Sequence, residues 1–307
     1  RRPDVVHVAT EGPLGWSALR VARHLMLPVT SDFRTNFHTY ADHYGVGWLR
    51  APVAADLRRF HNRADATTVP TEALRCELER QGFRRLSVIA RGVDRGLFDP
   101  ARRDRALRAS WGAGDADLVV ATVGRLAPEK NRDTLRKAFE GVRGAVPGSE
   151  LLLVGDGPLR ARLQEAWPDA LFAGIRRGED LAAHYASADL FVFPSLTETF
   201  GNVTAEAMAS GLPVVAYDYA AASSLIEHGV DGHRVPFGDF ARFVMSTVEL
   251  AMDPDRRRRM GERARAASSN WAWDAIVSRL EALMRDASGI RRAELDALRP
   301  APGTVRT

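Results

Sequence analysis

The chain has 307 residues, 45% of them hydrophobic, with 43 Lys and Arg against 39 Asp and Glu. This composition supplies enough apolar side chains for two domain cores, and the small excess of positive charge is too diffuse to indicate a nucleic-acid-binding protein. Cys76 is the only cysteine, which excludes an internal disulfide and a multi-cysteine metal site, and no run of about 18 apolar residues predicts a membrane-spanning helix.

The first 95 residues alternate short apolar runs with helical patterns, which predicts parallel strands joined by helices. We expect strands at residues 5–9, 28–31, 66–69 and 86–89, and helices at 14–25, 51–61 and 73–81. A polar, arginine-rich stretch containing Gly96 and Pro100 then breaks the alternation. We therefore predict a domain over 1–95 and a linker over 96–114.

The alternation restarts after this stretch, and we predict a second domain over 115–270. Its expected strands are 118–124, 151–155, 171–173, 190–193 and 214–216, and its expected helices are 133–146, 159–166, 179–186, 240–251 and 255–267, with one more between 198 and 210. A last helix at 271–285 precedes residues 286–307, which we expect to form a disordered tail. The predicted fold class is α/β, with two doubly wound Rossmann-like domains facing a ligand-binding cleft.

Two carboxylates stand out in the segment SLTETFGNVTAEAMASGLPVVA, which starts at Ser195 and follows a strand. Glu198 falls in the loop and Glu206 in the helix. The unpaired N–H groups of a helix start suit a phosphate, and a carboxylate in the second turn can accept hydrogen bonds from ribose hydroxyls. The alternative is that both acids are solvent-exposed and have no function.

A second polar segment, GRLAPEKN, also follows a predicted strand and contains Arg125 and Lys130. Lys130 is one of only two lysines in the chain. A guanidinium fork and a compact ammonium can together hold a diphosphate, although a solvated basic turn would have the same pattern. The turn GDGP at 155–158 offers glycines that let a backbone approach a ligand, so we include Gly155 among the donor-binding candidates. A tight turn before a helix is the alternative.

The order of four motifs along the chain resembles the donor-binding half of glycosyltransferase family 4, retaining enzymes of the GT-B fold. The motifs are GRLAPEKN, LLLVGDGP, YASADLFVFPSLTETFGNVTAEAMASGLPVVA and IEHGVDG, and the similarity runs from about Val5 to Arg285. Within the family the chain is most similar to the GDP-mannose-dependent α-mannosyltransferases. The resemblance implies a cytoplasmic enzyme that transfers a sugar, with mannose favoured, from a nucleotide-diphosphate sugar to a lipid or glycan acceptor.

The same resemblance implies roles for individual residues. Arg125 and Lys130 would bind the donor diphosphate, Glu198 would lie near the transferred sugar, and Glu206 would bind the ribose. It also implies that the loop facing the sugar and the phosphate is formed by Thr199, Phe200, Gly201 and Asn202. Ile175 and Arg176 would pack against the base. No cofactor, metal ion or nucleic acid is implied. The leaving diphosphate would be stabilised electrostatically and would itself take the proton of the acceptor.

Two departures from the family pattern concern the first domain. Related sequences usually have a histidine where this chain has Arg34, which leaves His38 as a candidate replacement near the reacting sugar. The family's first domain also normally begins with a strand and a glycine-rich loop upstream of anything equivalent to Val5. We therefore expect an N-terminally truncated first domain, with a strand edge exposed and sugar transfer impaired.

Other interpretations remain open from the sequence. The chain could bind a nucleotide sugar without turnover, or it could be a GT-B nucleotide-sugar epimerase. Asp115 and Asp117 match a metal-binding motif of another glycosyltransferase fold. Because this acidic pair lies in a polar loop before a strand, we expect no metal there. The basic run Arg256 to Arg259 could contact anionic lipid as a peripheral membrane site, or it could be a solvated helix face.

Overall fold

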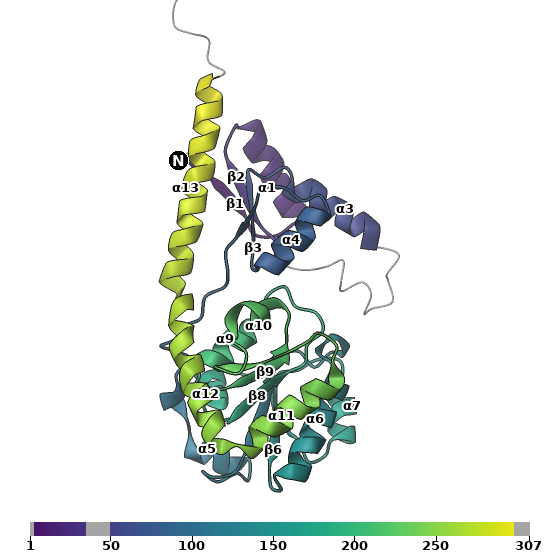
Figure 1. The fold of residues 1–307 in the computed structure, drawn as a ribbon. Coiled ribbons are helices and arrows are strands. Elements are labelled where there is room, and N and C mark those ends of the chain that lie inside the picture. Colours follow the sequence, from purple (N-terminus) through teal and green to yellow (C-terminus); the bar gives the residue numbers. More distant parts are fainter. Residues whose placement is uncertain (1–2, 35–49, 298–307) are drawn as a thin grey trace, which may run out of the picture. The chain divides into compact units, whose positions relative to one another are not determined.

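The computed structural model describes residues 3–34 and 50–297 (Figure 1). The chain divides into two compact units. The first consists of the residues up to Ala90 together with those from Asp274 onward, and the second consists of Arg91–Trp273. Each unit contains one parallel β-sheet whose strands are connected through helices. This confirms the predicted α/β class.

The first unit contains a four-stranded parallel sheet in the order β1-β2-β3-β4. Its elements are β1 (Val6–Val8), α1 (Pro13–His24), β2 (Val29–Asp32), α3 (Arg50–His61), β3 (Ala66–Val69), α4 (Glu72–Arg80), β4 (Leu86–Val88) and, from the other end of the chain, α13 (Trp273–Ala297). All four strands lie where the apolar runs predict them. Two apolar clusters form the interior, one around Leu19 and Phe60 and the other around Phe33 and Leu78.

A chain of buried polar side chains crosses the middle of this first sheet. The Ser31 hydroxyl lies 2.8 Å from the Thr67 hydroxyl and 3.0 Å from Nδ1 of His61, whose Nε2 lies 3.0 Å from Glu11. The order of groups is that of a Ser-His-acid triad, but Ser31 and His61 are both 0% exposed. A substrate cannot reach them, so we interpret the network as one that satisfies polar groups in a buried parallel sheet.

The second unit contains a six-stranded parallel sheet in the order β10-β9-β8-β5-β6-β7. Its strands are β5 (Val119–Val123), β6 (Glu150–Val154), β7 (Leu171–Gly174), β8 (Leu190–Phe193), β9 (Val214–Tyr217) and β10 (Gly232–Val235). Its helices are α5 (Arg105–Ser110), α6 (Arg132–Ala145), α7 (Arg160–Ala166), α8 (Gly178–Ala186), α9 (Asn202–Ala209), α10 (Ala220–Leu225), α11 (Phe240–Met252) and α12 (Pro254–Ala267). The chain builds outward from β5 to β7 and then returns to place β8 on the other side of β5. In such sheets, ligands bind beyond the carboxyl ends of the strands where the order reverses.

The core of the second unit explains why its strands are continuous apolar runs. Strands β5, β8 and β9 are buried along their whole length, as expected for parallel strands covered on both faces. Helices α6 and α11 pack closely because Gly141 has no side chain; a Cβ there would lie 2.9 Å from Val248.

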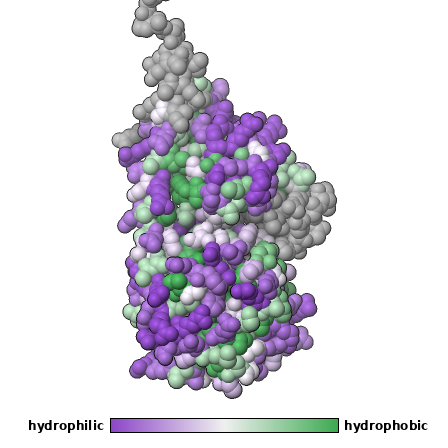
Figure 2. Space-filling view, in the orientation of Figure 1, coloured by the Kyte–Doolittle hydropathy of each residue, from purple (hydrophilic) through white to green (hydrophobic). Residues whose placement is uncertain are grey.

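On the face seen in Figure 2, polar residues cover most of the surface and apolar ones appear in small patches.

Three short elements were not predicted, and two boundaries differ. Strand β10 has the polar sequence GHRV, and α5 and α10 have only six residues each, too few to show a period. Residues 96–114, predicted as a linker, belong to the second unit. The reason is Arg108, which is 1% exposed and whose guanidinium binds Asp189 at 3.0 Å and three backbone carbonyls.

The last helix also extends further than the sequence predicts. The pattern predicts an end at Arg285, but α13 continues to Ala297. The added segment, DASGIRRAELDA, contains mainly good helix formers and no proline, so nothing in it ends the helix. Residues 298–307 lie outside the described part of the chain.

Candidate functional site

The site is organised where the strand order of the second sheet reverses. Lys130 follows β5, and Ser195 and Glu198 follow β8, so both loops leave neighbouring strands at the same edge of the sheet. The structure brings the two loops together through an ion pair between Lys130 Nζ and Glu198 Oε1. The Ser195 hydroxyl donates a hydrogen bond of 2.8 Å to the same carboxylate oxygen. The site therefore contains a cation paired with an anion. The sequence identified the two residues in separate motifs and did not predict that they pair.

Lys130 is fixed from several sides. It ends a short 3₁₀ turn, Pro128–Lys130, and is followed by Asn131 in the left-handed conformation (φ 51°). Its ammonium lies 5.5 Å from the centre of the Phe193 ring, and its side chain is only 10% exposed. With a Glu198 side chain that is 15% exposed, this is a largely buried ion pair. Removing one partner of such a pair leaves the other charge buried without compensation.

The other basic candidate, Arg125, is exposed at the surface of the same loop. Beneath the loop lies Arg132, which is 4% exposed and donates a hydrogen bond of 2.7 Å to the backbone carbonyl of Arg125. Burial lowers the pKa of Arg132 to about 10, with the negative charge of Glu129 acting in the opposite direction. The guanidinium is still charged at neutral pH and adds a fixed positive charge under the loop. Sequence analysis missed this residue, whose only signal was its position directly after GRLAPEKN.

Glu206 lies in the space between α8 and α9 and is not an exposed helix residue. Its Oε2 accepts a hydrogen bond of 2.9 Å from the hydroxyl of Tyr185, which is 0% exposed. Burial raises the pKa of Glu206, and the bond from Tyr185 lowers it to a smaller extent. One face of the carboxylate is thus fixed by the protein. Tyr185 was missed by sequence analysis because it lies 21 positions earlier, in another helix.

The loop before α9 contains Thr199, Phe200 and Gly201 and leads into Asn202. Gly201 has φ 93° and forms the N-cap of α9, a left-handed conformation that favours glycine. The side chain of Phe200 anchors the loop because the residue is only 3% exposed. Its backbone carbonyl also accepts a hydrogen bond of 2.7 Å from the amide of Ala221. Asn202 is the first residue of the helix and is exposed. A pocket of ≈ 10 Å³ lies next to Glu198, with room for about one water molecule.

Gly155 has a structural function that is visible without a ligand. A Cβ at Gly155 would lie 2.1 Å from the carbonyl oxygen of Gly124, and one at Gly157 would lie 2.5 Å from that of Leu126. Because both residues lack a side chain, the loop after β6 packs against the backbone of the loop that contains Arg125. The two loops are joined by hydrogen bonds from Leu126 to Asp156 and from Leu159 to Leu126. Contact between Gly155 and a donor stays a prediction.

Ile175 and Arg176 follow β7, at the same edge of the sheet as the other candidates. Ile175 is 63% exposed, which is unusual for a large aliphatic side chain at the end of a strand. Arg176 is held by hydrogen bonds of 2.8 Å to the Ala173 carbonyl and 3.1 Å to Asp180. An exposed apolar side chain beside a fixed guanidinium suits the packing of a flat base, and that function stays a prediction.

Other candidates lie apart from this cluster or outside the description. His38 falls in the segment 35–49, which is not described. Arg34 lies two residues after β2 and is bound to Asp32, the last residue of that strand, at 2.5 Å. Asp115 and Asp117 precede β5 and therefore lie at its amino end, where Asp115 binds Arg105 at 3.1 Å and Asp117 accepts a hydrogen bond from the amide of Gly114. The acidic pair is therefore at the opposite end of β5 from Lys130.

Half of the basic run on α12 makes contacts within the unit. Arg256 donates to Nε2 of His233 at 3.0 Å, and Arg257 binds the carbonyls of Leu250 and Ala251 at the end of α11. Only Arg258 and Arg259 are exposed. Among the described residues, no helix is both long enough and apolar enough to cross a membrane.

We expect the variant Arg258→Gln with Arg259→Gln to bind anionic vesicles as the parent does, because Arg258 is already paired with Glu262 at 3.1 Å. The measurement is flotation with vesicles that contain phosphatidylserine. If both arginines faced the membrane, their loss would remove about 1 kcal/mol each and weaken binding roughly 30-fold. A loss of that size would show that α12 is a membrane contact.

Comparison with known proteins agrees with this geometry. Residues 117–253 match the family model of group 1 glycosyl transferases, and residues 1–97 match that of glycosyltransferase family 4. The chain is 38% identical over 283 residues to a GDP-mannose-dependent alpha-mannosyltransferase of Mycobacterium tuberculosis, covering 92% of this chain and 73% of that protein.

Two further comparisons concern a more distant relative and the fold. The chain is 32% identical over 258 residues to the GDP-mannose-dependent alpha-(1-6)-phosphatidylinositol monomannoside mannosyltransferase of the same organism, covering 78% of this chain and 67% of that protein. Among solved structures, sucrose-phosphate synthase from Thermosynechococcus elongatus aligns with a TM-score of 0.77 at 22% identity, covering 92% of this chain and 73% of that one. That structural likeness shows the GT-B fold.

Proposed function

The chain belongs to glycosyltransferase family 4, and on that basis we propose that it transfers a mannosyl group from GDP-mannose to a lipid or glycan acceptor, with retention of configuration. The coarser part of this statement, a glycosyltransferase that uses a nucleotide sugar, follows from family membership. Mannose and guanosine are supported by the names of three relatives that are 34–38% identical to this chain. A lipid acceptor is supported by the phosphatidylinositol mannoside relative.

The observation that carries the proposal is the convergence of Lys130 and Glu198 where the sheet order reverses. In the free protein each satisfies the other. A bound donor would present its diphosphate to Lys130, so the phosphate oxygens would compete with Glu198 for the ammonium. Glu198, still held by the Ser195 hydroxyl, would then be available to accept hydrogen bonds from the sugar. The ion pair thus keeps both groups aligned before the donor arrives.

In the proposed reaction, the bond between the anomeric carbon and the donor phosphate breaks as the acceptor oxygen attacks from the same face. Negative charge grows on the departing diphosphate, and the acceptor proton moves to one of its oxygens. Lys130 and Arg125, with Arg132 beneath them, would stabilise this charge. Because Lys130 is buried, its interaction with the phosphate is screened little by water.

The nucleoside would be bound by groups on the same edge of the sheet. Glu206 would accept hydrogen bonds from the two ribose hydroxyls, with its orientation fixed by Tyr185. The exposed side chain of Ile175 would pack against the base. These contacts would position the donor without taking part in bond breaking.

Calorimetry against a panel of nucleotide sugars, followed by analysis of the products, tests the proposal. We expect GDP-mannose to bind more tightly than UDP-glucose, UDP-N-acetylglucosamine and GDP-glucose, and a new mannosyl bond to form in the presence of phosphatidylinositol or a mannoside acceptor. Tighter binding of a UDP sugar would overturn the donor assignment. An altered free sugar, or binding of GDP-mannose without any transfer, would contradict transferase activity of this chain.

We expect Tyr185→Phe to weaken GDP binding about threefold to tenfold, the contribution of one hydrogen bond. Because the Tyr185 hydroxyl lowers the pKa of Glu206, its removal should also move the midpoint of the pH dependence of binding upward. Titration of GDP between pH 4 and pH 8 measures both effects. The substituted phenylalanine would preserve the ring contacts with Phe98 and Phe191, so an unchanged midpoint would mean that Tyr185 only fills space.

A further inference from the structure

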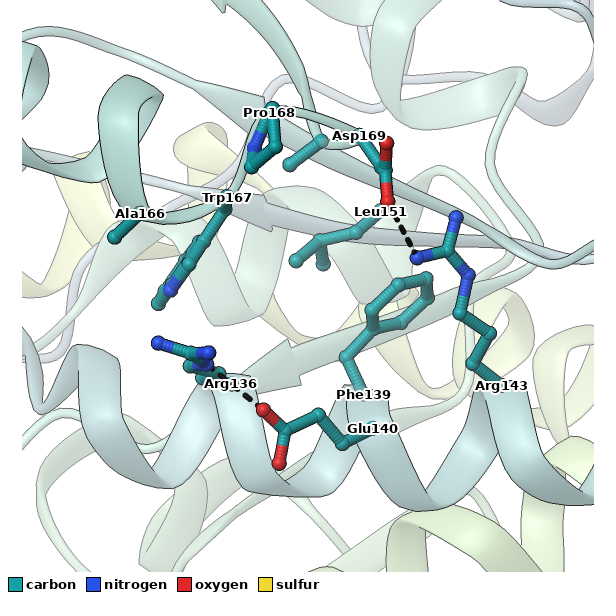
Figure 3. A pocket seen from close by; sticks show the side chains of 10 residues that line it. Arg136, Phe139, Glu140, Arg143, Leu151, Ala166, Trp167, Pro168 and Asp169 are labelled. Atoms are coloured by element: carbon teal, nitrogen blue, oxygen red, sulfur yellow. Dashed lines mark hydrogen bonds and ion pairs between the residues drawn. The ribbon is translucent and has the colours of Figure 1, made fainter.

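A second pocket of ≈ 150 Å³ opens on the same unit, between α6 and the segment that joins α7 to β7 (Figure 3). One wall contains Leu151, at the amino end of β6, and another contains Trp167. The candidate donor site lies beyond the carboxyl ends of the strands, so the pocket is at the opposite edge of the sheet. None of its lining residues belongs to the candidate donor site.

The inner part of this pocket is apolar and partly aromatic. Phe139 and Trp167 come from different elements and both project into it, with Leu151 between them (Figure 3). Trp167 is 8% exposed and belongs to the core, so its ring is held in place. A cavity of about 150 Å³ is known to admit a single six-membered ring such as benzene. The volume therefore suits one ring and not a nucleotide.

The rim of the pocket is polar and electrically balanced. Arg143 binds Asp169 at 3.0 Å, and Arg136 binds Glu140 at 2.8 Å, as the dashed lines in Figure 3 show. An anionic ligand would approach two carboxylates and a cationic one two guanidinium groups, so the rim favours a neutral ligand. Both ion pairs are solvent-exposed and contribute little to stability, so hydroxyl groups can share their hydrogen bonds at small cost.

We propose that this pocket binds one pyranose ring of a neutral glycan. The C–H face of the sugar packs against Trp167 and Phe139, and its hydroxyls accept hydrogen bonds from Arg143 and donate them to Asp169. Arg143 is already oriented by Asp169 and by its position 6.0 Å from the centre of the Phe139 ring. The assignment does not depend on the identity of the donor, because the pocket is separate from the donor site.

Titration of the ¹⁵N-labelled protein with methyl α-mannopyranoside tests this assignment. We expect saturable shifts of the Asp169 and Ala170 amide signals, with a dissociation constant of about 1–10 mM, typical of a weak small ligand. The shifts should persist when the donor site is saturated with GDP. Loss of the shifts in the presence of GDP would place the sugar in the donor site and overturn the proposal, as would shifts that do not saturate.

Two further comparisons distinguish sugar recognition from simple filling of an apolar hollow. Asp169→Ala should weaken binding of the mannoside about fivefold or more, because it removes a charged hydrogen-bond acceptor. Glu281→Ala is the matched control, since Glu281 is an exposed acid paired with Arg285 at 2.6 Å on α13, and it should leave the affinity unchanged. Equal affinity for cyclohexanol and the mannoside, or unchanged binding in Asp169→Ala, would contradict a carbohydrate site.

Discussion

We expect Lys130→Ala to lower the rate of sugar transfer about 10²- to 10³-fold, the loss typical of removing one group that stabilises charge in the transition state. The effect on GDP-mannose binding should be smaller, because the charge on the diphosphate increases as the bond to the sugar breaks. Single-turnover kinetics at saturating donor separates the two. Weaker binding with an unchanged rate of chemistry would show that Lys130 only binds the donor.

The chain offers a matched control for this substitution. Lys137 is the only other lysine and is 60% exposed in an ion pair with Glu140 on α6. Lys137→Ala should transfer sugar at the parental rate. A comparable loss in this variant would mean that the assay responds to a general change in charge.

Loss of folding must also be separated from loss of catalysis, since Lys130→Ala leaves Glu198 buried without its partner. We expect this single variant to unfold at a lower temperature than the parent, because an unpaired buried charge is strongly destabilising. The double variant Lys130→Ala with Glu198→Gln removes both charges and should recover most of the stability without recovering transfer. If the double variant recovered stability and sugar transfer together, the single variant would have been inactive only because it unfolds.

Glu206→Gln should weaken GDP binding roughly 10- to 100-fold, because a charge-assisted hydrogen bond to a ribose hydroxyl contributes about 1.5–3 kcal/mol. The glutamine amide is neutral and has one acceptor oxygen in place of two. Calorimetry with GDP measures the effect. The exposed acid Glu249 on α11 provides the control, and Glu249→Gln should bind GDP as the parent does. A dissociation constant for Glu206→Gln within twofold of the parental value would exclude the ribose contact.

The same substitution should make the free protein more stable at neutral pH. Burial raises the pKa of Glu206 above its ordinary value of 4.5, so the folded protein retains a proton that the unfolded chain releases first. The stability contributed by this protonation is complete below about pH 4.5 and is lost as the pH rises through the raised folded pKa. The glutamine amide has no such proton to lose, so Glu206→Gln should unfold at a higher temperature than the parent at pH 7. Its unfolding temperature should also change less than that of the parent as the pH is lowered from 7.

These opposite effects on binding and on stability, if both are measured, would identify Glu206 as a residue retained for binding at the expense of stability. A parental unfolding temperature above that of Glu206→Gln at pH 7 would mean that the carboxylate is stabilised in the free protein. GDP binding by the parent should also weaken as the pH falls through the pKa of Glu206, because the protonated acid accepts weaker hydrogen bonds. Glu206→Gln should lack that dependence.

Local pattern was sufficient to predict most elements and to select several candidate site residues. The continuous apolar runs that became β5 and β8 mark strands buried on both faces, and the polar residues directly after each run identify the loops at their carboxyl ends. Lys130, Glu198 and Glu206 were recognised in this way, because strand ends and helix starts leave a signal within a few positions. Elements without such a signal were missed, as with the polar strand β10 and the six-residue helices α5 and α10.

The sequence by itself thus determined where the strands lie and which side chains follow them, since these depend on neighbours a few residues apart. Only the tertiary structure decided which of those side chains meet. Lys130 and Glu198 are 68 positions apart, and they pair because β8 returns to lie beside β5 instead of continuing the sheet beyond β7. The bond from Tyr185 to Glu206 and the burial of Arg108 likewise depend on packing between distant segments. No local pattern specifies that order, because adjacency in a sheet is set by how the whole set of helices and strands buries its apolar surface.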